Sequence, residues 1–373
     1  MKSRLEAGLN IARSLASLSL VAIALTGCTP VNEEAQVTPV GYKACLATSE
    51  TAIETGSIAD QSLEGIQRAV LNKGVAYKVL NARTDATTIS YISQLKNLVR
   101  SDCNLIVAVS HRMSVATYRV AKANPKVNFV LVDAALTNSN KLPASLPNVR
   151  EVRFDAPSAA FLAGYLAASA SKTQTVGAFG GANVKQVTDV LAGFKKGVDT
   201  FNDKNNTAVK VIGAAGDYPS RWKFTSSWAS SDEQTSLAYK LADAGADVIF
   251  AYSGSTTLGL NPAGGAALGG PAFIGIDSDW FNLSQNTDVA PTLLASITKG
   301  IAPAVEGSIA AGVSGKFAGG QSGSYLGTLA NGGVALTEEH TLAYPSGVAA
   351  ALAELKTQIV AGILVVDSGL NNK

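Results

Sequence analysis

The stretch from Ala76 to Ser110 reads AYKVLNARTDATTISYISQLKNLVRSDCNLIVAVS, and its pattern decides the fold. It opens with one short apolar run, Ala76–Leu80, and closes with another, Leu105–Ser110. Between the two runs, apolar residues recur at the spacing of one helix face, at Ile89, Ile92, Leu95, Leu98 and Val99. A strand, a helix and a second strand in this order indicate a βαβ unit with parallel strands.

The same alternation of short apolar runs and helical spacing continues along the chain. Further strand-like runs are Ala44–Thr48, Asn128–Asp133, Thr175–Phe179, Val209–Ala214, Asp247–Tyr252 and Phe273–Asp277. Helical spacing recurs at Leu63, Ile66, Ala69 and Val70, and again at Val187, Val190, Leu191, Phe194 and Val198. The strands are apolar throughout rather than alternating, as expected when helices cover both faces of a parallel sheet. The sequence therefore predicts an α/β protein with doubly wound parallel sheets.

The number of these strand–helix units exceeds what one sheet usually holds, and the segment Asn148–Pro157 (NVREVRFDAP) interrupts the pattern. We therefore expect two lobes with a cleft between them. The expected first lobe is 42–152 plus about 297–317, the second is 153–296 plus about 318–345, and 346–373 forms a C-terminal helix and tail. Helices are expected at Lys299–Gly315 and Ser346–Ala361.

The N-terminus carries a lipoprotein signal. The sequence Leu25-Thr26-Gly27-Cys28 ends an apolar run that begins at Leu15 and follows three basic residues. A charged start, an apolar core and small residues before a cysteine are typical of a signal peptide whose cysteine receives a diacylglycerol. The run is too short to span a bilayer. We expect a signal peptide at 1–27, acylated Cys28, a flexible tether at 28–41, and a protein anchored on the extracytoplasmic face of the cell membrane.

Composition excludes several function classes. Removal of the signal leaves equal numbers of basic and acidic residues, so the mature chain has no electrostatic footprint for nucleic acid. Three cysteines, two histidines and no CxxC pair give no basis for a metal site or a cofactor. Cys45 and Cys103 fit either a disulfide, which an extracytoplasmic compartment permits, or two buried thiols.

Ligands of open parallel sheets bind beyond the carboxyl ends of the strands. The residues at those ends are Ser49 and Glu50; Ser110 and His111; Asp133; Gly180 to Asn183; Tyr252 to Thr256; and Asp277 to Trp280. Asp277 directly follows an apolar strand, where a carboxylate needs a hydrogen-bond donor, and we favour a ligand hydroxyl. The glycine-rich turns fit tight βα connections equally well, and Ser57 with Asp60 has the spacing of a helix cap.

Catalytic motifs are missing from the sequence: there is no GxSxG, HExxH or GxxxxGK[ST] pattern. His111 has no nucleophile or orienting carboxylate at an obvious spacing. We therefore expect a protein that is not an enzyme.

Several segments in order resemble the basic membrane protein family of lipoproteins, the purine-nucleoside receptors of ABC transporters. They are CNLIVAVS (103–110), FLAGYLAA (161–168), VGAFGG (176–181), AGFKKGV (192–198), AGADVIFAYSGSTTLG (244–259), IGIDSD (274–279), ASITKG (295–300) and YLGTLANGGVAL (325–336). The resemblance covers nearly all of the chain from about Ala44 to Val365. It implies a two-lobed type I periplasmic-binding-protein fold that closes on a nucleoside.

The resemblance also implies roles for individual residues. Asp277 would hold the ribose hydroxyls and Lys299 would add a donor, while Gly254, Ser255 and Thr256 would form the turn that packs on the sugar. Trp228 is similar in position to the aromatic residue that stacks on the base.

The first strand departs from the family pattern D-x-G-G-x-x-D-x-S-F-N-Q. Aligned without gaps, Ser49 stands at the first aspartate, Ile58 at the phenylalanine, Ala59 at the asparagine and Asp60 at the glutamine, followed by Glu64-Gly65. One stacking ring and two hydrogen-bonding groups for the base are thus missing, while the residues for the sugar are retained.

We interpret the chain as the substrate-binding lipoprotein of an ABC transporter, a monomer that captures a nucleoside or a similar ribosyl ligand and passes it to a permease. The alternatives are a degenerate ligand sensor of the same fold, a binder of a non-nucleoside small polar ligand, and a nucleoside hydrolase on an α/β frame.

Overall fold

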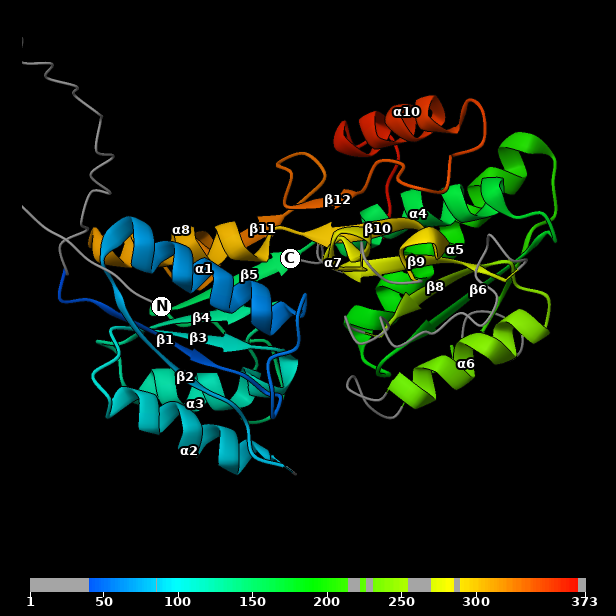
Figure 1. Ribbon diagram of the computed structural model, residues 1–373. Coiled ribbons are helices and arrows are strands. Elements are labelled where there is room, and N and C mark those ends of the chain that lie inside the picture. Colours follow the sequence, from blue (N-terminus) through cyan, green and yellow to red (C-terminus); the bar gives the residue numbers. More distant parts are fainter. Residues whose placement is uncertain are drawn as a thin grey trace, which may run out of the picture. The chain divides into compact units, whose positions relative to one another are not determined.

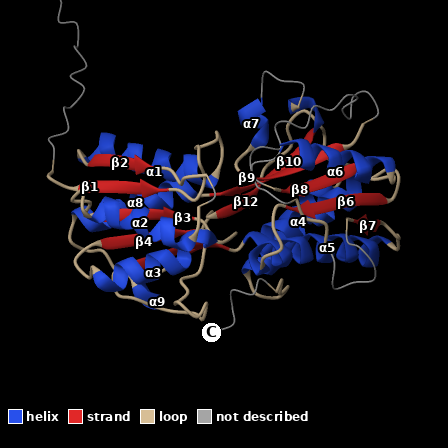
Figure 2. Cartoon of the chain, turned by 90° about the horizontal axis from the view of Figure 1, so that it is seen from below, coloured by secondary structure: helices blue, strands red, loops and turns tan. Residues whose placement is uncertain are grey.

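The computed structural model describes residues 40–84, 86–213, 222–225, 231–253, 270–284 and 289–367. All of them belong to the larger of the chain's two units, Val37–Lys373. Two six-stranded sheets, each flanked by helices, form the larger unit (Figure 1). Figure 2 shows the same sheets from below, with helices on both sides of each.

The first sheet has the strand order β11-β5-β4-β3-β1-β2, and all its neighbouring strands are parallel. Its strands are β1 (Lys43–Ala47), β2 (Ala76–Leu80), β3 (Leu105–Val109), β4 (Asn128–Val132), β5 (Val149–Phe154) and β11 (Tyr325–Gly327). Its helices are α1 (Ile58–Lys73), α2 (Thr88–Val99), α3 (Ser114–Ala123), α8 (Ile301–Val313) and the short α9 (Gly320–Gly323). We call this sheet and its helices lobe 1.

Successive residues of the central lobe 1 strands, β1, β3 and β4, point to opposite faces, and both faces are buried. Leu46 and Val107 pack with Ile66 of α1 and Val305 of α8. The side chains in between pack with α2 and α3, as seen for Ile106. Figure 1 shows α1 and α8 on one side of the sheet and α2 and α3 on the other. Burial on both sides explains why these strands read as continuous apolar runs.

The second sheet has the order β12-β10-β9-β8-β6-β7 and is parallel except for β12, which pairs antiparallel with β10. Its strands are β6 (Thr175–Gly180), β7 (Lys210–Ile212), β8 (Val248–Tyr252), β9 (Ala272–Asp277), β10 (Leu293–Lys299) and β12 (Val334–Leu336). Its helices are α4 (Ala156–Ala170), α5 (Lys185–Asn205), α6 (Ser231–Asp243), α7 (Trp280–Ser284) and α10 (Val348–Val360). We call this assembly lobe 2.

The chain makes its last passage into lobe 2 later than its sequence pattern indicates. It leaves lobe 1 after β5 and returns at Gly300, between β10 of lobe 2 and α8, which packs on α1. Strand β11 pairs with β5 in lobe 1, whereas the sequence analysis placed 318–345 in lobe 2. The reason is that β11 extends the first sheet at its β5 edge, and the chain reaches lobe 2 again only at β12.

Helices α4 and α5 approach each other through glycines. A Cβ atom built on Gly197 would lie 1.9 Å from the carbonyl oxygen of Phe161, and one on Gly164 would lie 1.9 Å from that of Phe194. Real Cβ atoms do not come so close to a carbonyl oxygen, so only glycine permits this contact. The segments FLAGYLAA and AGFKKGV therefore form the helix pair that supports lobe 2.

A disulfide joins Cys45 in β1 to Cys103 just before β3, with a Cα–Cα distance of 6.0 Å. Of the two arrangements that the sequence left open, the structure contains the bridge. Both residues are buried on the α2–α3 side of the sheet. The disulfide thus links two adjacent central strands of lobe 1.

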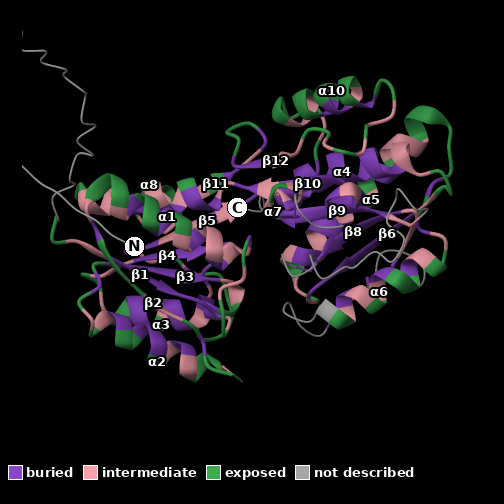
Figure 3. Ribbon diagram, in the orientation of Figure 1, coloured by how far each residue is buried: buried purple, intermediate pink, exposed green. Residues whose placement is uncertain are grey.

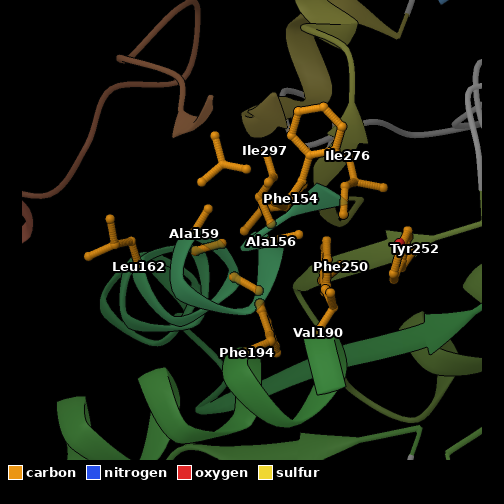
Figure 4. Close-up of a cluster of buried hydrophobic side chains, with 14 of the residues drawn as sticks. Phe154, Ala156, Ala159, Leu162, Val190, Phe194, Phe250, Tyr252, Ile276 and Ile297 are labelled. Atoms are coloured by element: carbon orange, nitrogen blue, oxygen red, sulfur yellow. The ribbon is translucent and has the colours of Figure 1, made fainter. Parts of the chain in front are cut away.

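Buried residues concentrate in the strands and on the helix faces turned toward them (Figure 3). In lobe 2, the Phe194 ring of α5 stacks on Phe250 of β8 at 5.0 Å, and Phe250 stacks on Tyr252 at 6.3 Å. Figure 4 shows these rings beside Ile276 of β9 and Ile297 of β10. This core fixes the ends of β8, β9 and β10, where polar residues follow.

Candidate ligand-binding cleft

The carboxyl ends of strands from both sheets border a cavity. It encloses about 960 Å³ of space, part of it open to solvent. Its lining residues are Ser49, Glu50, Thr51, Ala52, Glu54, Ser57, Ile58, Ala59, Val109, Ser110, His111, Asp133, Val184, Gln186, Val187, Tyr252 and Asp277. Lobe 1 contributes the β1–α1 loop and the ends of β3 and β4, and lobe 2 contributes the start of α5 and the ends of β8 and β9. We call this cavity the cleft.

A buried cation joins the two lobes at the cleft. Lys299, at the end of β10, places its Nζ 2.7 Å from Asp277 Oδ1 in the same lobe and 2.9 Å from Asp133 Oδ2 in lobe 1. Tyr252 lies beside them, with its hydroxyl 3.4 Å from the same nitrogen. Lys299, Asp277 and Asp133 are only 3%, 6% and 8% exposed. One ammonium therefore pairs with a carboxylate from each lobe.

Burial governs the ionisation of this group of side chains. Burial by itself lowers the pKa of Lys299, but the carboxylates of Asp133 and Asp277 outweigh it, and the net pKa lies well above the usual value for lysine. Burial raises the pKa of Asp277, the Lys299 charge opposes the rise, and Asp133 adds to it. Burial also raises the pKa of Tyr252. At neutral pH, Lys299 is charged and Tyr252 keeps its proton.

Three polar residues that follow strands at the cleft have left-handed backbone conformations. The φ angles are 86° at Ser110, 54° at Asp133 and 77° at Asp277. Such conformations cost roughly 1–3 kcal/mol for a residue other than glycine and cluster where function constrains the backbone. Here they occur where the chain turns out of β3, β4 and β9, and they set the direction in which the two aspartates enter the cleft.

Helix α1 of lobe 1 contacts the end of β9 directly. Gln61 Nε2 donates to the carbonyl oxygen of Asp277 at 3.0 Å, and Ser278 Oγ donates to that of Gly56 at 2.6 Å. Ser57 caps the helix, because its side chain accepts the N–H of Asp60 at 3.1 Å. The first turn of α1 and the β9 loop thus close one side of the cleft.

His111 stands between the cleft and a second cavity. This second cavity, also about 960 Å³ with part open to solvent, borders the cleft and has Asp133, Arg153, Lys185 and Asp189 among its lining residues. Burial and the nearby Arg112 lower the pKa of His111, and Asp133 and Glu50 offset part of that change. His111 is therefore neutral at physiological pH and offers one donor and one acceptor.

The structure brings together several of the residues that the sequence nominated. Ser49, Ile58, His111 and Asp277 line the cleft, and Lys299 contacts Asp277 from behind. Asp60 does not line it; its carboxylate accepts the N–H of Gly56 at 2.8 Å. Trp228, Gly254, Ser255, Thr256 and the lipidation candidate Cys28 lie outside the described residues.

Four further residues line the cleft for which no ligand role was predicted from the sequence. Glu50, Asp133 and Tyr252 were recognised only as strand-end residues, and Glu54 was not singled out. Their strand-end positions were the available signal. The pairing of Asp133 with Lys299 joins residues 166 positions apart, and no spacing in the sequence reveals it.

Within the described part of the chain, no group of three histidine, cysteine, aspartate or glutamate side chains is placed to hold a metal ion. None of the helices described there combines the length and the apolarity needed to cross a membrane.

Two α/β lobes with a cleft at their strand ends define a ligand-binding protein of the type I periplasmic-binding class. Solved structures agree. A solute-binding protein of an ABC transporter system from Aeropyrum pernix K1 has a TM-score of 0.71 and 21% identity, over 87% of this chain and 93% of that one. One from Conexibacter woesei has a TM-score of 0.63 and 19% identity, over 88% and 99%. These identities support the fold alone.

The family model described as "ABC transporter substrate-binding protein PnrA-like" matches residues 46–368, and the chain belongs to this family. Basic membrane protein D of Borreliella burgdorferi is 26% identical over 260 residues, 68% of this chain and 71% of that protein. The CD4+ T-cell-stimulating antigen of Listeria monocytogenes is 28% identical over 56% of this chain and 54% of its own length. The family resemblance inferred from the sequence is confirmed. The protein is thus a substrate-binding protein of the ABC transporter type.

Proposed function

We propose that this protein captures a nucleoside or a similar ribosyl ligand in the cleft and passes it to an ABC permease. The observation that carries the proposal is the buried ion pair of Asp277 and Lys299, which extends to Asp133 across the cleft. No covalent bond of the ligand is made or broken, because the protein binds the ligand and releases it unchanged.

Vicinal hydroxyls match this arrangement of charges. A carboxylate accepts hydrogen bonds and an ammonium donates them, and a hydroxyl does both. Two ribose hydroxyls can therefore donate to the Asp277 carboxylate, which Lys299 holds in place from behind. Because the site is buried, these charge-assisted bonds form away from competing water, and each contributes about 1.5–3 kcal/mol.

Ligand capture would proceed by closure of the lobes, since the cleft has walls on both. The bonds from Gln61 to Asp277 and from Ser278 to Gly56 join the lobes at one edge of the cleft. A ligand seated between Asp277 and the β1–α1 loop adds contacts to each lobe and favours the closed arrangement.

Attachment to the membrane belongs to the same proposal. Cys28 follows a signal-like apolar segment, and a lipid on it would keep a monomeric receptor on the extracytoplasmic face, close to its permease. Labelling cells with an alkyne analogue of palmitate tests this. The parent protein should take up the label, and Cys28→Ala should not; a label retained by Cys28→Ala would refute the anchor.

Calorimetric titration of the full-length protein with nucleosides tests the proposed ligand. We expect saturable heat for at least one nucleoside, and binding roughly 10- to 150-fold weaker for Asp277→Asn, which keeps the size of the side chain but removes its charge. Asp279→Asn is the matched control, because Asp279 lies in the same loop and does not line the cleft. Heat from a different small polar ligand alone would reject the nucleoside, and parent-like binding by Asp277→Asn would reject the site.

A further inference from the structure

The loop between β1 and α1 places two carboxylates, Glu50 and Glu54, in the wall of the cleft. In the family pattern this region supplies an aromatic ring and amide groups for the base, whereas this chain has Ile58 and Ala59 there. The loop therefore offers the ligand a different chemistry from the one that the family resemblance implies.

Local bonds fix the position of Glu50. Its carbonyl oxygen accepts the N–H of Ala82 at 2.9 Å and the hydroxyl of Thr48 at 2.8 Å. Its Oε1 accepts from Ser49 Oγ at 3.0 Å and lies 3.8 Å from Arg112 Nη1. The contact with Arg112 is longer than a direct charge-assisted hydrogen bond and partly exposed, so acceptor capacity remains on the Glu50 carboxylate.

Glu54 has no positively charged partner among the described residues. Burial raises its pKa, and the negative charge of Glu50 raises it further. The other charges of the cleft do not neutralise it, because Lys299 is held by Asp133 and Asp277, and burial lowers the pKa of His111. A ligand that covers this carboxylate must provide a donor in place of the water that it removes.

We propose that Glu50 and Glu54 select ligands that direct hydrogen-bond donors or a positive charge at the β1–α1 loop, which among nucleosides means bases with an exocyclic amino group. This inference rests on the proposed function and adds the class of base. An ionised carboxylate accepts hydrogen bonds and cannot donate them. An amino group facing the carboxylate donates to it, whereas a ring carbonyl at the same place supplies no donor.

The test uses pairs of nucleosides that differ in the amino group. Guanosine carries a 2-amino group that inosine lacks, and cytidine carries a 4-amino group where uridine has a carbonyl. In calorimetric titrations of the full-length protein at pH 7.5, we expect the amino-bearing member of at least one pair to bind roughly 10- to 150-fold more tightly.

Two variants connect this preference to the loop. Glu54→Gln and Glu50→Gln keep the side-chain volume and remove the charge, and we expect each to reduce the ratio of affinities within the pair. Glu354→Gln, on the exposed surface of α10, is the matched control and should leave the ratio unchanged. Because the pKa of Glu54 is raised, lowering the pH toward 5 should also reduce the ratio, as the protonated group can donate to a carbonyl.

The outcomes separate the two proposals. Equal affinity within both pairs, or a ratio that neither loop variant changes, overturns the selection by Glu50 and Glu54 while leaving nucleoside binding intact. Absence of heat from every nucleoside overturns the proposed function itself, and this inference with it.

Discussion

Replacing Lys299 by methionine should destabilise the protein strongly, because this side chain is the shared cation of two buried carboxylates. Its Nζ lies 2.7 Å from Asp277 and 2.9 Å from Asp133, and only 3% of the residue is exposed. Methionine retains the length of the aliphatic stem and removes the charge. Both carboxylates then remain in the interior without a counter-charge.

Breaking a buried pair by removing one partner costs about 3–5 kcal/mol. If the urea dependence is about 3 kcal/mol per molar, the unfolding midpoint falls by about 1–1.7 M. The assay is urea unfolding of parent and variant at pH 7.5, followed by circular dichroism. The deficit should shrink when the pH is lowered toward 5, because a proton can replace the lost charge at Asp277, whose pKa burial already raises.

A triple variant provides the control. Combining Lys299→Met with Asp133→Asn and Asp277→Asn removes the unpaired charges as well, and should regain part of the stability that the single variant loses. A single variant as stable as the parent, or a deficit that does not change with pH, would contradict the view that Lys299 is the shared counter-charge of both aspartates.

Further predictions concern the helix pair, the disulfide, the lobe contact and His111. Gly197→Ala should lower the free energy of unfolding by about 1–3 kcal/mol, because the new Cβ would meet the Phe161 carbonyl oxygen. Gly307→Ala is the control, since the space around its Cβ is open and the free energy of unfolding should not change. Equal thermal midpoints for the two variants would refute this. Replacing Cys45 and Cys103 by alanine should lower the free energy of unfolding by about 4 kcal/mol, from the loop of 58 residues that the disulfide closes; insensitivity of the parent to reductant would refute it. Gln61→Leu with Ser278→Ala should speed ligand release in stopped-flow measurements, since both bonds join the lobes; an unchanged rate would refute that. Because the pKa of His111 is lowered from 6.5, stability should fall as the pH drops below 6.5, and His111→Gln should flatten this dependence; parallel pH profiles would count against it.

The strands could be predicted from the sequence where their pattern depends only on consecutive residues. Strands buried on both faces, such as Leu105–Val109, are continuous apolar runs, and each of the predicted runs contains a strand. Strand β5 was interpreted as a crossover because Arg150, Glu151 and Arg153 interrupt its apolar residues. Strands β11 and β12 have three residues each, too few for a periodic pattern, so the pairing of β11 with β5 in lobe 1 could not be foreseen.

The sequence predicts which strand ends border the cleft, but it predicts the contacts between their side chains less well. Strand-end positions identified Ser49, His111 and Asp277 because the carboxyl ends of parallel strands share one edge. The ion pair of Asp133 with Lys299 joins different lobes, so it depends on tertiary packing. Asp60 was predicted to bind the ligand because it aligns with the glutamine of the family pattern. Its carboxylate instead accepts the N–H of Gly56 within the same turn. Such a local bond competes with a role in ligand binding, and a sequence does not reveal which prevails.

The most direct measurement of the central claim compares a nucleoside with its 2′,3′-dideoxy analogue in calorimetric titrations of the full-length protein. The two differ only in the hydroxyls assigned to Asp277, the carboxylate that Lys299 holds in place. Our account predicts saturable heat for the nucleoside and a loss of affinity of at least roughly 10-fold for the analogue. Equal affinities would show that Asp277 and Lys299 do not hold the sugar and would contradict the account.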